Sequence, residues 1–387
     1  MVSKIYSNLN NLSSETKAGV VLIIATILAL ICSNTGIKEL YSQLIHLGFR
    51  IQLGEMYLDK PLILWINDGL MSIFFFIIGL ELKREFLEGH LKDLHSILLP
   101  SAAALGGVIA PVMIYCLLTM GSPELQNGWA IPMATDIAFV VGILSLFGTR
   151  VPVKLKLFIL TLAIMDDLAA ILVIAFFHTK TLSYSSMLIS VGCIAVLFIM
   201  NKIKVERLPS YFFVGLILWL SVLKSGLHAT LSGVVLAMFI PLYSKDKKAP
   251  ILFSLEKDLY PLVSFVIIPL FAFANAGVEL SHLTLDNIFN PLTLGVFFGL
   301  VLGKPIGITT FSILYLIITN SASPVSFKQI ITIGFFGGIG FIMSLFIAGL
   351  SFDASQMLLN ESRLGILAAT FVSATIGSIL LRKQLRK

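Results

Sequence analysis

Long apolar stretches separated by short polar segments dominate the chain from residue 17 onward. A helix needs about 20 predominantly apolar residues to cross the hydrocarbon core of a bilayer. The pattern therefore predicts an all-α polytopic membrane protein of about 12 transmembrane helices, with residues 1–387 forming a single integral membrane domain. The expected spans lie near residues 17–33, 61–82, 96–119, 127–147, 154–177, 184–201, 209–223, 227–243, 259–276, 290–318, 329–350 and 363–381.

One segment between the first two spans has a different period. From Phe49 to Leu58, apolar and polar residues alternate up to Gly54, and the alternation resumes beyond that glycine. A period of two with a glycine in the middle is typical of a β-hairpin. We expect a small extracytoplasmic hairpin within residues 45–59, whose free edge can pair with a second copy to form a homodimer; the alternative is an irregular loop.

Two spans carry helix-breaking residues at membrane depth. Residues 131–136 combine Pro132 with the polar pair Thr135 and Asp136, and residues 334–340 contain four glycines in seven positions. Non-helical backbone survives in a bilayer only where it lines a cavity or is buried in protein, and interrupted spans in both halves of a chain are typical of a transporter binding site. The simpler alternative is two ordinary kinked helices.

Composition supports membrane insertion and excludes nucleic acid as a partner. Hydrophobic residues make up 57% of the chain and charged residues 12%, against about 25% charged in soluble domains. The net charge of +6 comes from basic residues spread between apolar runs rather than gathered in one patch. With both termini in the cytoplasm, twenty basic residues fall in inside segments, as the positive-inside rule requires, and the outside segments hold only Lys38, Arg50, Lys60, Lys180, Lys224 and Arg363.

The fifth span contains two adjacent acids, Asp166 and Asp167. One carboxylate at the centre of a bilayer costs roughly 2.5 to 3.5 kcal/mol on insertion scales, so an intramembrane acid indicates an ion or proton site. Adjacent positions on a helix point about 100° apart, so the two acids should have different partners. Burial favours the protonated form of a carboxylic acid and a bound cation favours the ionised form; one of the two acids can therefore alternate between a proton and a cation.

Two further charges at membrane depth are candidates for partners. If the two interrupted spans cross at their breaks, like helix ends meet and need counter-charges. Asp136 can neutralise facing N-termini, and Lys304 can either neutralise facing C-termini or pair with one of the two acids. The simpler interpretation of Lys304 is a lysine whose amine reaches the membrane surface.

These segments resemble the NhaA family of sodium/proton antiporters of the bacterial inner membrane, nearly from end to end. The motifs that carry the resemblance are residues 134–139, 165–170, 269–277 and 303–307. The resemblance implies twelve helices, inverted repeats formed by spans three to five and ten to twelve, and spans four and eleven broken and crossed at the site. The association of broken spans and inverted repeats with transporters was itself drawn partly from NhaA proteins. The match of this sequence to both is therefore one piece of evidence rather than two.

The resemblance also implies roles for individual residues. Asp167 would bind the sodium or lithium ion and the exchanged protons, and Asp166 would pair with Lys304. Thr135 and Asp136 would support the site from the break. The transport would be electrogenic, exporting sodium for a larger number of protons. Oxygen ligands suit such a hard cation, and no cofactor is expected.

A second group of ionisable residues lies near the cytoplasmic end of the second span. Glu81 and Glu85, with Arg84 between them, read by themselves as an ion-paired helix end. In the family, this stretch, a glutamate matching Glu256 and a histidine matching His228 are tied to pH activation. Asp68 also matches a family position and is interpreted as structural. The residues around Glu256 depart from the family pattern, with Phe253 and Ser254 before it and Lys257 after it, which leaves the pH set point open.

Three other functions compete with antiport. An intramembrane aspartyl protease needs a Gly-x-Gly-Asp sequence, but here Gly338-Ile339-Gly340 is followed by Phe341. A channel needs no group that changes protonation. A sodium- or proton-coupled symporter of a small organic solute, built on a similar frame, is the stronger alternative, and a requirement for an organic co-substrate would distinguish it.

Overall fold

The computed structural model describes residues 13–53, 56–89, 92, 94–177, 183–246, 249–280 and 289–386. Within these residues, nine helices are long and apolar enough to cross a membrane, and two further bent helix pairs bring the number of spans to as many as eleven. One two-stranded antiparallel sheet accompanies them. The all-helical membrane fold with two broken spans and a small hairpin, predicted from the sequence, is confirmed.

The chain divides into two compact units, described separately here. The first contains residues 1–35, 93–170 and 276–387, and the second contains residues 36–92 and 171–275. The long helix α9 (Val153–Phe177) runs from the first unit into the second, with the boundary after Ala170.

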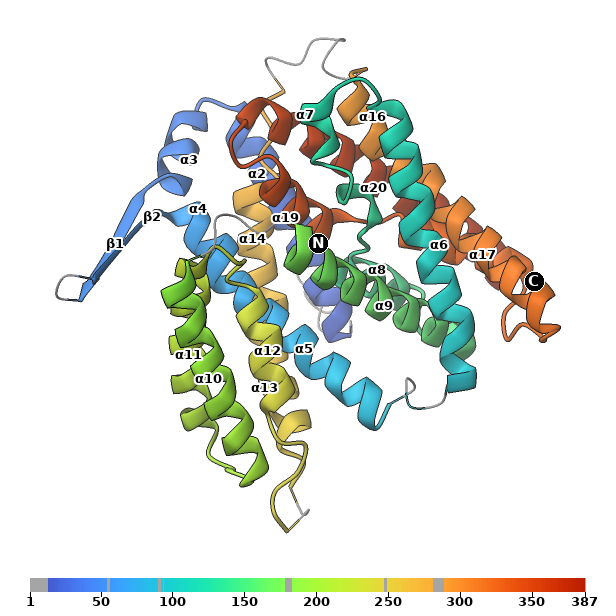
Figure 1. The fold of residues 1–387 in the computed structure, drawn as a ribbon. Coiled ribbons are helices and arrows are strands. Elements are labelled where there is room, and N and C mark those ends of the chain that lie inside the picture. The colour runs from blue at the N-terminus through green and yellow to red at the C-terminus, as the bar shows by residue number, and fades with distance from the viewer. Residues whose placement is uncertain are drawn as a thin grey trace, which may run out of the picture. The chain divides into compact units, whose positions relative to one another are not determined.

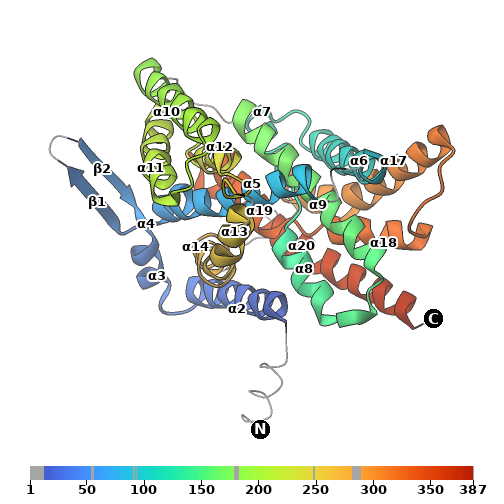
Figure 2. The same ribbon diagram turned by 90° about the horizontal axis from the view of Figure 1, so that it is seen from below.

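The first unit is built on pairs of helices in close contact. α6 (Leu94–Leu118) packs along α17 (Lys304–Thr319), and the two run side by side in Figures 1 and 2. Their closest approach joins Gly106 and Gly307, where an added Cβ on either residue would lie within about 2.2 Å of the other's carbonyl oxygen. Small residues let membrane helices approach this closely, and van der Waals packing then holds the pair.

Further helices of the first unit also pack in pairs. α2 (Ser14–Asn34) contacts α8 (Ile137–Leu146), and α20 (Gln356–Leu385) contacts α16 (Pro291–Phe298). A buried apolar cluster lies among α8, α9, α17 and α18 (Phe327–Gly337), with Phe158, Leu162 and Phe336 among its members. This cluster surrounds the region in which the two broken spans meet.

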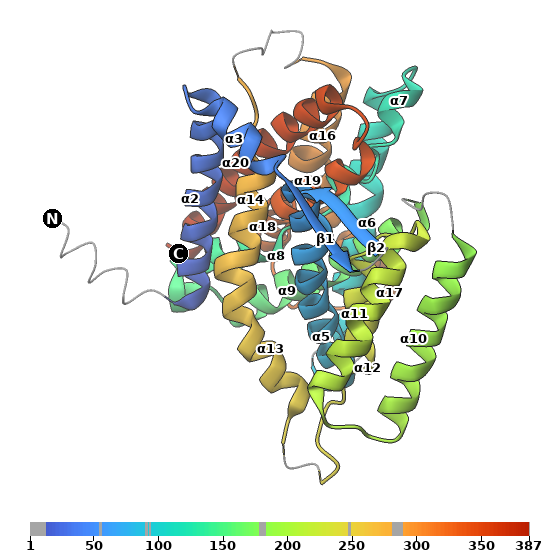
Figure 3. The same cartoon turned by 90° about the vertical axis from the view of Figure 1, so that its left-hand side faces the viewer.

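The second unit contains the hairpin and several helices. β1 (Gly48–Leu53) and β2 (Met56–Pro61) pair from Gly48 with Pro61 to Leu53 with Met56, and Figure 3 shows the two strands side by side. The hairpin therefore extends two residues beyond the expected limit of 59. The helices of the second unit include α3 (Lys38–Ile45), α5 (Met71–Leu87), α10 (Tyr184–Lys202) and α11 (Leu208–Ser225). They also include α13 (Ile251–Leu262), which continues through η5 (Val263–Ile267) into α14 (Ile268–Asn275).

The eighth expected span, 227–243, is shorter than predicted. Its helix, α12, covers only Leu231–Phe239. Gly226 ends α11 in the left-handed conformation, with φ of 91°, and residues 226–230 form a turn. At the other end Ile240 is extended, with ψ of 128°, because the residue before a proline disfavours helical geometry and Pro241 follows.

Three spans contain a π-helical turn that the apolar pattern does not predict. These turns are η1 (Trp65–Leu70), η5 (Val263–Ile267) and η6 (Gly299–Gly303). A π-turn inserts one residue into a helix and often occurs at functional sites. The turn η6 ends directly before Lys304.

Candidate functional site

The fourth span is broken at a short extended segment. The short helices α7 (Pro123–Gln126) and η3 (Ile131–Met133) precede the break, and α8 follows it at an angle of 41°. Ala134 and Asp136 have extended backbone, with ψ of 149° and 100°. The break follows Pro132, which has no backbone N–H to continue a helix.

The eleventh span is broken at its glycines. α18 ends at Gly337, α19 (Phe341–Ser351) begins after three intervening residues, and the two helices meet at 45°. Together with the 41° bend of the fourth span, this confirms the sequence expectation of two discontinuous helices.

The two breaks lie against each other. The backbone N–H of Asp136 donates to the carbonyl of Ile339 at 2.7 Å, and the hydroxyl of Ser344 donates to the carbonyl of Ile131 at 2.8 Å. Thr135 Oγ1 lies 2.8 Å from the carbonyl oxygen of Gly337. Each break therefore supplies hydrogen-bond partners to the other, which is how non-helical backbone is accommodated where water is scarce.

Asp136 joins the N-termini of two helices. Its Oδ1 accepts from the N–H of Phe139 in the first turn of α8, and its Oδ2 accepts from the N–H of Ile342 in the first turn of α19, both at 3.0 Å. A helix N-terminus carries roughly half a positive elementary charge. One buried carboxylate thus faces two such ends, which matches the counter-charge expected for it.

Asp166 and Lys304 form an ion pair inside the first unit. Lys304 Nζ lies 2.5 Å from Asp166 Oδ2, and both side chains have an exposed fraction of 0%. Thr135 Oγ1 lies 2.5 Å from the same carboxylate oxygen. The threonine hydroxyl has one proton, so at any moment it can donate either to Asp166 or to the Gly337 carbonyl. Because the Lys304 side chain is fully buried and its amine is paired with Asp166, it does not extend to the surface of the protein, contrary to the snorkelling alternative.

Asp167 follows on the same helix and is 2% exposed. The preceding residue, Asp166, connects this helix to the broken region, which offers oxygen atoms of three kinds: the carboxylate of Asp166, the hydroxyl of Thr135 and the carbonyls of the crossed breaks. Within the described ranges, no three His, Cys, Asp or Glu side chains gather as they would for a transition metal. Oxygen donors at broken helices are the type that coordinates Na⁺ in secondary transporters.

The second ionisable group from the sequence is assembled in the other unit. Arg84 reaches from α5 to Glu256 of α13, with Nε 2.9 Å from Oε2, and its Nη1 lies 2.7 Å from Glu85 Oε1. Glu81 lies one turn before Glu85 on α5. These residues form a partly exposed network that ties α5 to α13.

His228 lies apart from that network. α12 runs parallel to α5, since Gly233 packs against the Ser72 backbone and Lys83 Nζ donates to the carbonyls of Met238 and Ile240. His228 precedes the first residue of α12. Lys83, which is next to Arg84 on α5, contacts the last turn of α12. The histidine and the Arg84 network are therefore separated by about the length of α12.

Asp68, interpreted as structural, is bonded in two ways. Its carboxylate forms an ion pair with Lys60 of β2 at 2.7 Å. Its backbone carbonyl accepts from Trp219 Nε1 at 3.1 Å and from Ser72 Oγ at 2.5 Å. The residue connects the hairpin, the second span and α11.

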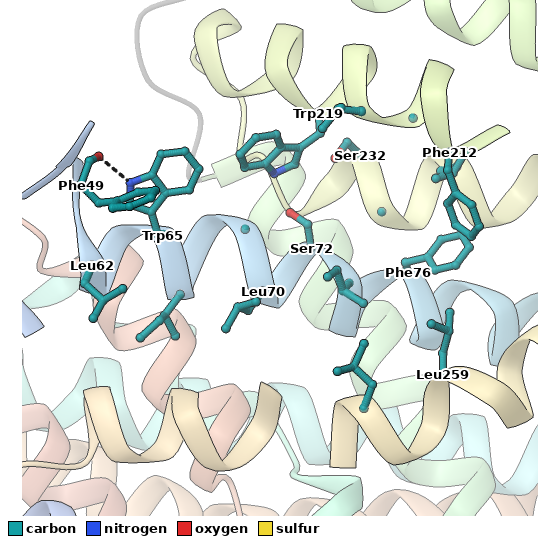
Figure 4. A pocket seen from close by; sticks show the side chains of 18 residues that line it. Phe49, Leu62, Trp65, Leu70, Ser72, Phe76, Phe212, Trp219, Ser232 and Leu259 are labelled. Carbon is teal, nitrogen blue, oxygen red and sulfur yellow. Dashed lines mark hydrogen bonds between the residues drawn. The ribbon is translucent and has the colours of Figure 1, made fainter. Parts of the chain in front are cut away.

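One groove of the second unit is apolar, and none of the expected site residues lines it. It has a volume of about 650 Å³ and is shown in Figure 4. Four side chains in its lining carry polar groups, and all four donate to backbone carbonyls of the same unit: Trp65, Ser72, Trp219 and Ser232. Those side chains leave no free donor in this groove for a polar solute.

Several functional atoms were not identified from the sequence. The carbonyls of Gly337 and Ile339 and the N–H of Ile342 are backbone groups, for which side-chain identity gives no signal. Ser344 could have been noticed as a hydroxyl directly after the glycine-rich break. The ion pair between Lys60 and Asp68 joins residues eight positions apart, which no helical or strand spacing suggests.

The fold and the site together define a multi-pass membrane transporter with two crossed, broken spans. The sequence model of the Na⁺/H⁺ antiporter 1 family matches residues 10–381, and the chain belongs to this family. The transporter prediction is thereby confirmed, and the protease alternative is wrong.

Close relatives cover almost the whole chain. It is 47% identical over 376 residues to the Na(+)/H(+) antiporter NhaA of Actinobacillus pleuropneumoniae serotype 7 (strain AP76), covering 96% of this chain and 95% of that protein. It is 47% identical over 381 residues to NhaA of Sulfurovum sp. (strain NBC37-1), covering 97% of each. It is 46% identical over 376 residues to NhaA of Pseudomonas putida (strain GB-1), covering 96% of each.

Proposed function

We propose that this chain exchanges sodium or lithium ions for protons across the bacterial cytoplasmic membrane, exporting the cation while a larger number of protons enters. The observation that carries the proposal is the buried Asp166–Lys304 pair, held by Thr135 at the crossing of two broken spans and directly followed by Asp167. The relatives named as Na(+)/H(+) antiporters supply the identity of the ions.

The exchange follows from competition at Asp167. With Lys304 charged and Asp166 ionised, those two charges cancel, and the ionised carboxylate of Asp167 needs one further positive charge. Either a cation or a proton can supply this charge. Each weakens the binding of the other, because the buried site disfavours net charge. A cation arriving from the cytoplasm therefore displaces the proton, and a proton arriving from outside displaces the cation.

Electrogenic exchange requires a second group to change protonation. One cation exchanged for the proton of Asp167 alone would move no net charge. The ion pair of Asp166 and Lys304 is the ionisable contact adjoining Asp167, so we assign the additional proton to that pair. Transport is then driven by the membrane potential as well as by the proton gradient.

The crossed breaks supply the frame in which access can alternate. In the proposed arrangement, spans three to five and ten to twelve form the ion-binding bundle, and the remaining spans form the interface. Asp136 holds the first turns of α8 and α19 together, so the two broken spans move as one piece. We place both termini in the cytoplasm, as the distribution of basic residues indicates.

Regulation by pH is assigned to the network of Glu81, Arg84, Glu85 and Glu256. Its ion pairs link α5 and α13 and are partly exposed, so proton concentration can change the strength of the link. His228 remains a candidate, but its separation from the network means that it would act independently.

One reconstitution experiment tests the proposed function. Proteoliposomes with an entrapped pH dye are challenged with sodium, lithium, potassium and an organic solute. Sodium- and lithium-dependent release of protons, enhanced by a membrane potential of the appropriate sign and independent of the solute, is expected. Sodium movement that requires the organic solute would support symport, and proton movement without any cation would indicate a leak.

A further inference from the structure

The π-turn before Lys304 leaves one carbonyl without its usual donor. In an α-helix, the N–H of Lys304 would donate to the carbonyl of Leu300, four residues earlier. Here that N–H donates to Gly299, five residues earlier. The N–H five residues after Leu300 would belong to Pro305, which has none. Neither helical position therefore supplies a donor to the Leu300 carbonyl.

A buried hydroxyl from another helix lies at the same place. A Cβ added to Gly338, in the break of the eleventh span, would lie 2.5 Å from the Leu300 carbonyl oxygen and 2.7 Å from Ser373 Oγ. The two oxygens therefore face the same side of Gly338 and cannot be farther apart than the sum of these distances. Ser373 lies on α20, which packs against η6.

The Ser373 hydroxyl is itself available. Its side chain is 0% exposed, and Oγ makes no hydrogen bond with the described part of the chain. A buried hydroxyl and a buried carbonyl that both lack partners are each destabilising. In the structure Oγ does not bond to this carbonyl, so a bond between them requires the Ser373 side chain to move to another staggered χ1 position.

The observed π register can be compared with the α register that an uninterrupted helix would have, and only the π register needs this hydroxyl. In the α register, Lys304 N–H satisfies the Leu300 carbonyl. In the observed π register, that carbonyl needs an outside donor, and the inserted residue sets the direction in which the Lys304 side chain leaves the helix. The observed register is the one in which Lys304 Nζ meets Asp166.

We propose that Ser373 is a positioning residue for ion exchange: its hydroxyl donates to the Leu300 carbonyl, stabilises the π-turn and so holds Lys304 against Asp166. This inference deepens the proposed function, because it matters for transport only if the Lys304–Asp166 pair acts there. The glycine at 338 is required by the same arrangement, since any Cβ would collide with both oxygens.

The test is a cycle with Pro305. Ser373→Ala should raise the KM for sodium about fivefold, the factor expected from losing one ordinary hydrogen bond, with kcat changed much less. The pair would form less often, and Asp166 would less often be ionised to support the cation. Pro305→Ala restores an N–H five residues after Leu300, so Ser373→Ala introduced into the Pro305→Ala protein should leave KM unchanged. Ser373→Thr, which keeps a donor, should behave like the wild type.

Ser312→Ala is the matched control. Ser312 is also 0% exposed with an Oγ that bonds to no described residue, and it lies on α17 about two turns beyond Lys304. Ser312→Ala also removes a buried serine hydroxyl but leaves the π-turn unchanged, so it should not alter the KM for sodium. Equal effects of Ser373→Ala and Ser312→Ala, or an undiminished effect of Ser373→Ala beside Pro305→Ala, would overturn the proposal.

The same set of variants can be compared by their melting temperatures in detergent, a measurement that does not depend on transport. Ser373→Ala should lower the melting temperature more in the wild-type background than in Pro305→Ala. If Ser373→Ala fails to fold alone, recovery of folded protein in the Pro305→Ala background supports the proposal, and failure there as well refutes it. If the wild-type protein exchanges no sodium for protons, the proposed function is refuted. The melting temperatures would still test whether Ser373 stabilises the π-turn.

Discussion

Lys304 and Asp166, 138 positions apart in sequence, meet at 2.5 Å between Nζ and Oδ2 with no exposed surface on either side chain. Taking two charges out of water is expensive, and their attraction offsets the expense only when geometry and further hydrogen bonds are good. Thr135 supplies one such bond. The pair is therefore a sensitive point for both stability and transport.

Breaking this pair from either side should destabilise the protein. Lys304→Ala and Asp166→Asn should each lower the free energy of unfolding by about 3 to 5 kcal/mol, because the remaining charge is stranded. The double variant should lose less than the sum of the two, measured by thermal unfolding in detergent. Strictly additive losses would show that the two groups do not interact in the folded protein.

Asp167→Asn should abolish exchange. The amide keeps the shape of the carboxylate but can neither ionise nor titrate, so sodium-dependent release of protons in proteoliposomes should vanish. Asp258→Asn, a change at an exposed acid of α13, is the matched control and should retain exchange. A folded Asp167→Asn protein with normal exchange would remove Asp167 as the carrier.

Asp136→Ala should cost more stability than the loss of an ordinary helix cap. Replacing an N-cap residue by alanine costs about 0.5 to 2 kcal/mol, and Asp136 serves the first turns of two helices while being 2% exposed. Asn290→Ala, which removes the cap of α16 alone, is the matched comparison. Equal losses would mean that the contact with α19 contributes nothing to stability.

The Arg84 network should set part of the pH dependence. Arg84→Gln removes the bonds to both Glu85 and Glu256. Exposed ion pairs contribute up to about 1 kcal/mol, which corresponds to about 0.7 pH unit. Because the Glu85 side chain is only 11% exposed, the midpoint of the activity profile should move by about that much or more. His228→Gln, at the other end of α12, should have an independent and additive effect. A profile unchanged by Arg84→Gln would argue against regulation through the network.

Deletion of residues 49–58 should convert dimers to monomers in detergent. The strands pair with each other along one edge only, so their other edges remain able to pair with a second copy. Lys60 and its bond to Asp68 survive the deletion. Mass measured by light scattering, with exchange activity measured in parallel, provides the check. A truncated protein that remains dimeric would place the interface elsewhere, and a monomeric but inactive one would make the dimer the functional unit.

The sequence by itself determined the membrane fold and the broken spans. Apolar length is a direct physical requirement for crossing a bilayer, and proline or clustered glycine at that depth removes the local hydrogen bonds of a helix, so both features are readable from residue order. The acids Asp166 and Asp167 stood out for the same reason, since a charge in an apolar run demands a partner. The hairpin was visible as a change of period from Phe49 to Leu58.

Only the tertiary structure decided which charges meet. Local patterns allowed Lys304 to pair with an acid, to neutralise helix C-termini or to reach the surface, and the choice depends on the tertiary fold that brings Asp166 of α9 to Lys304 of α17. The π-turn of η6 was also beyond the apolar pattern, because a one-residue change of helical register leaves hydropathy unaltered. The separation of His228 from Arg84 likewise follows from the parallel course of α5 and α12, which no spacing along the chain encodes.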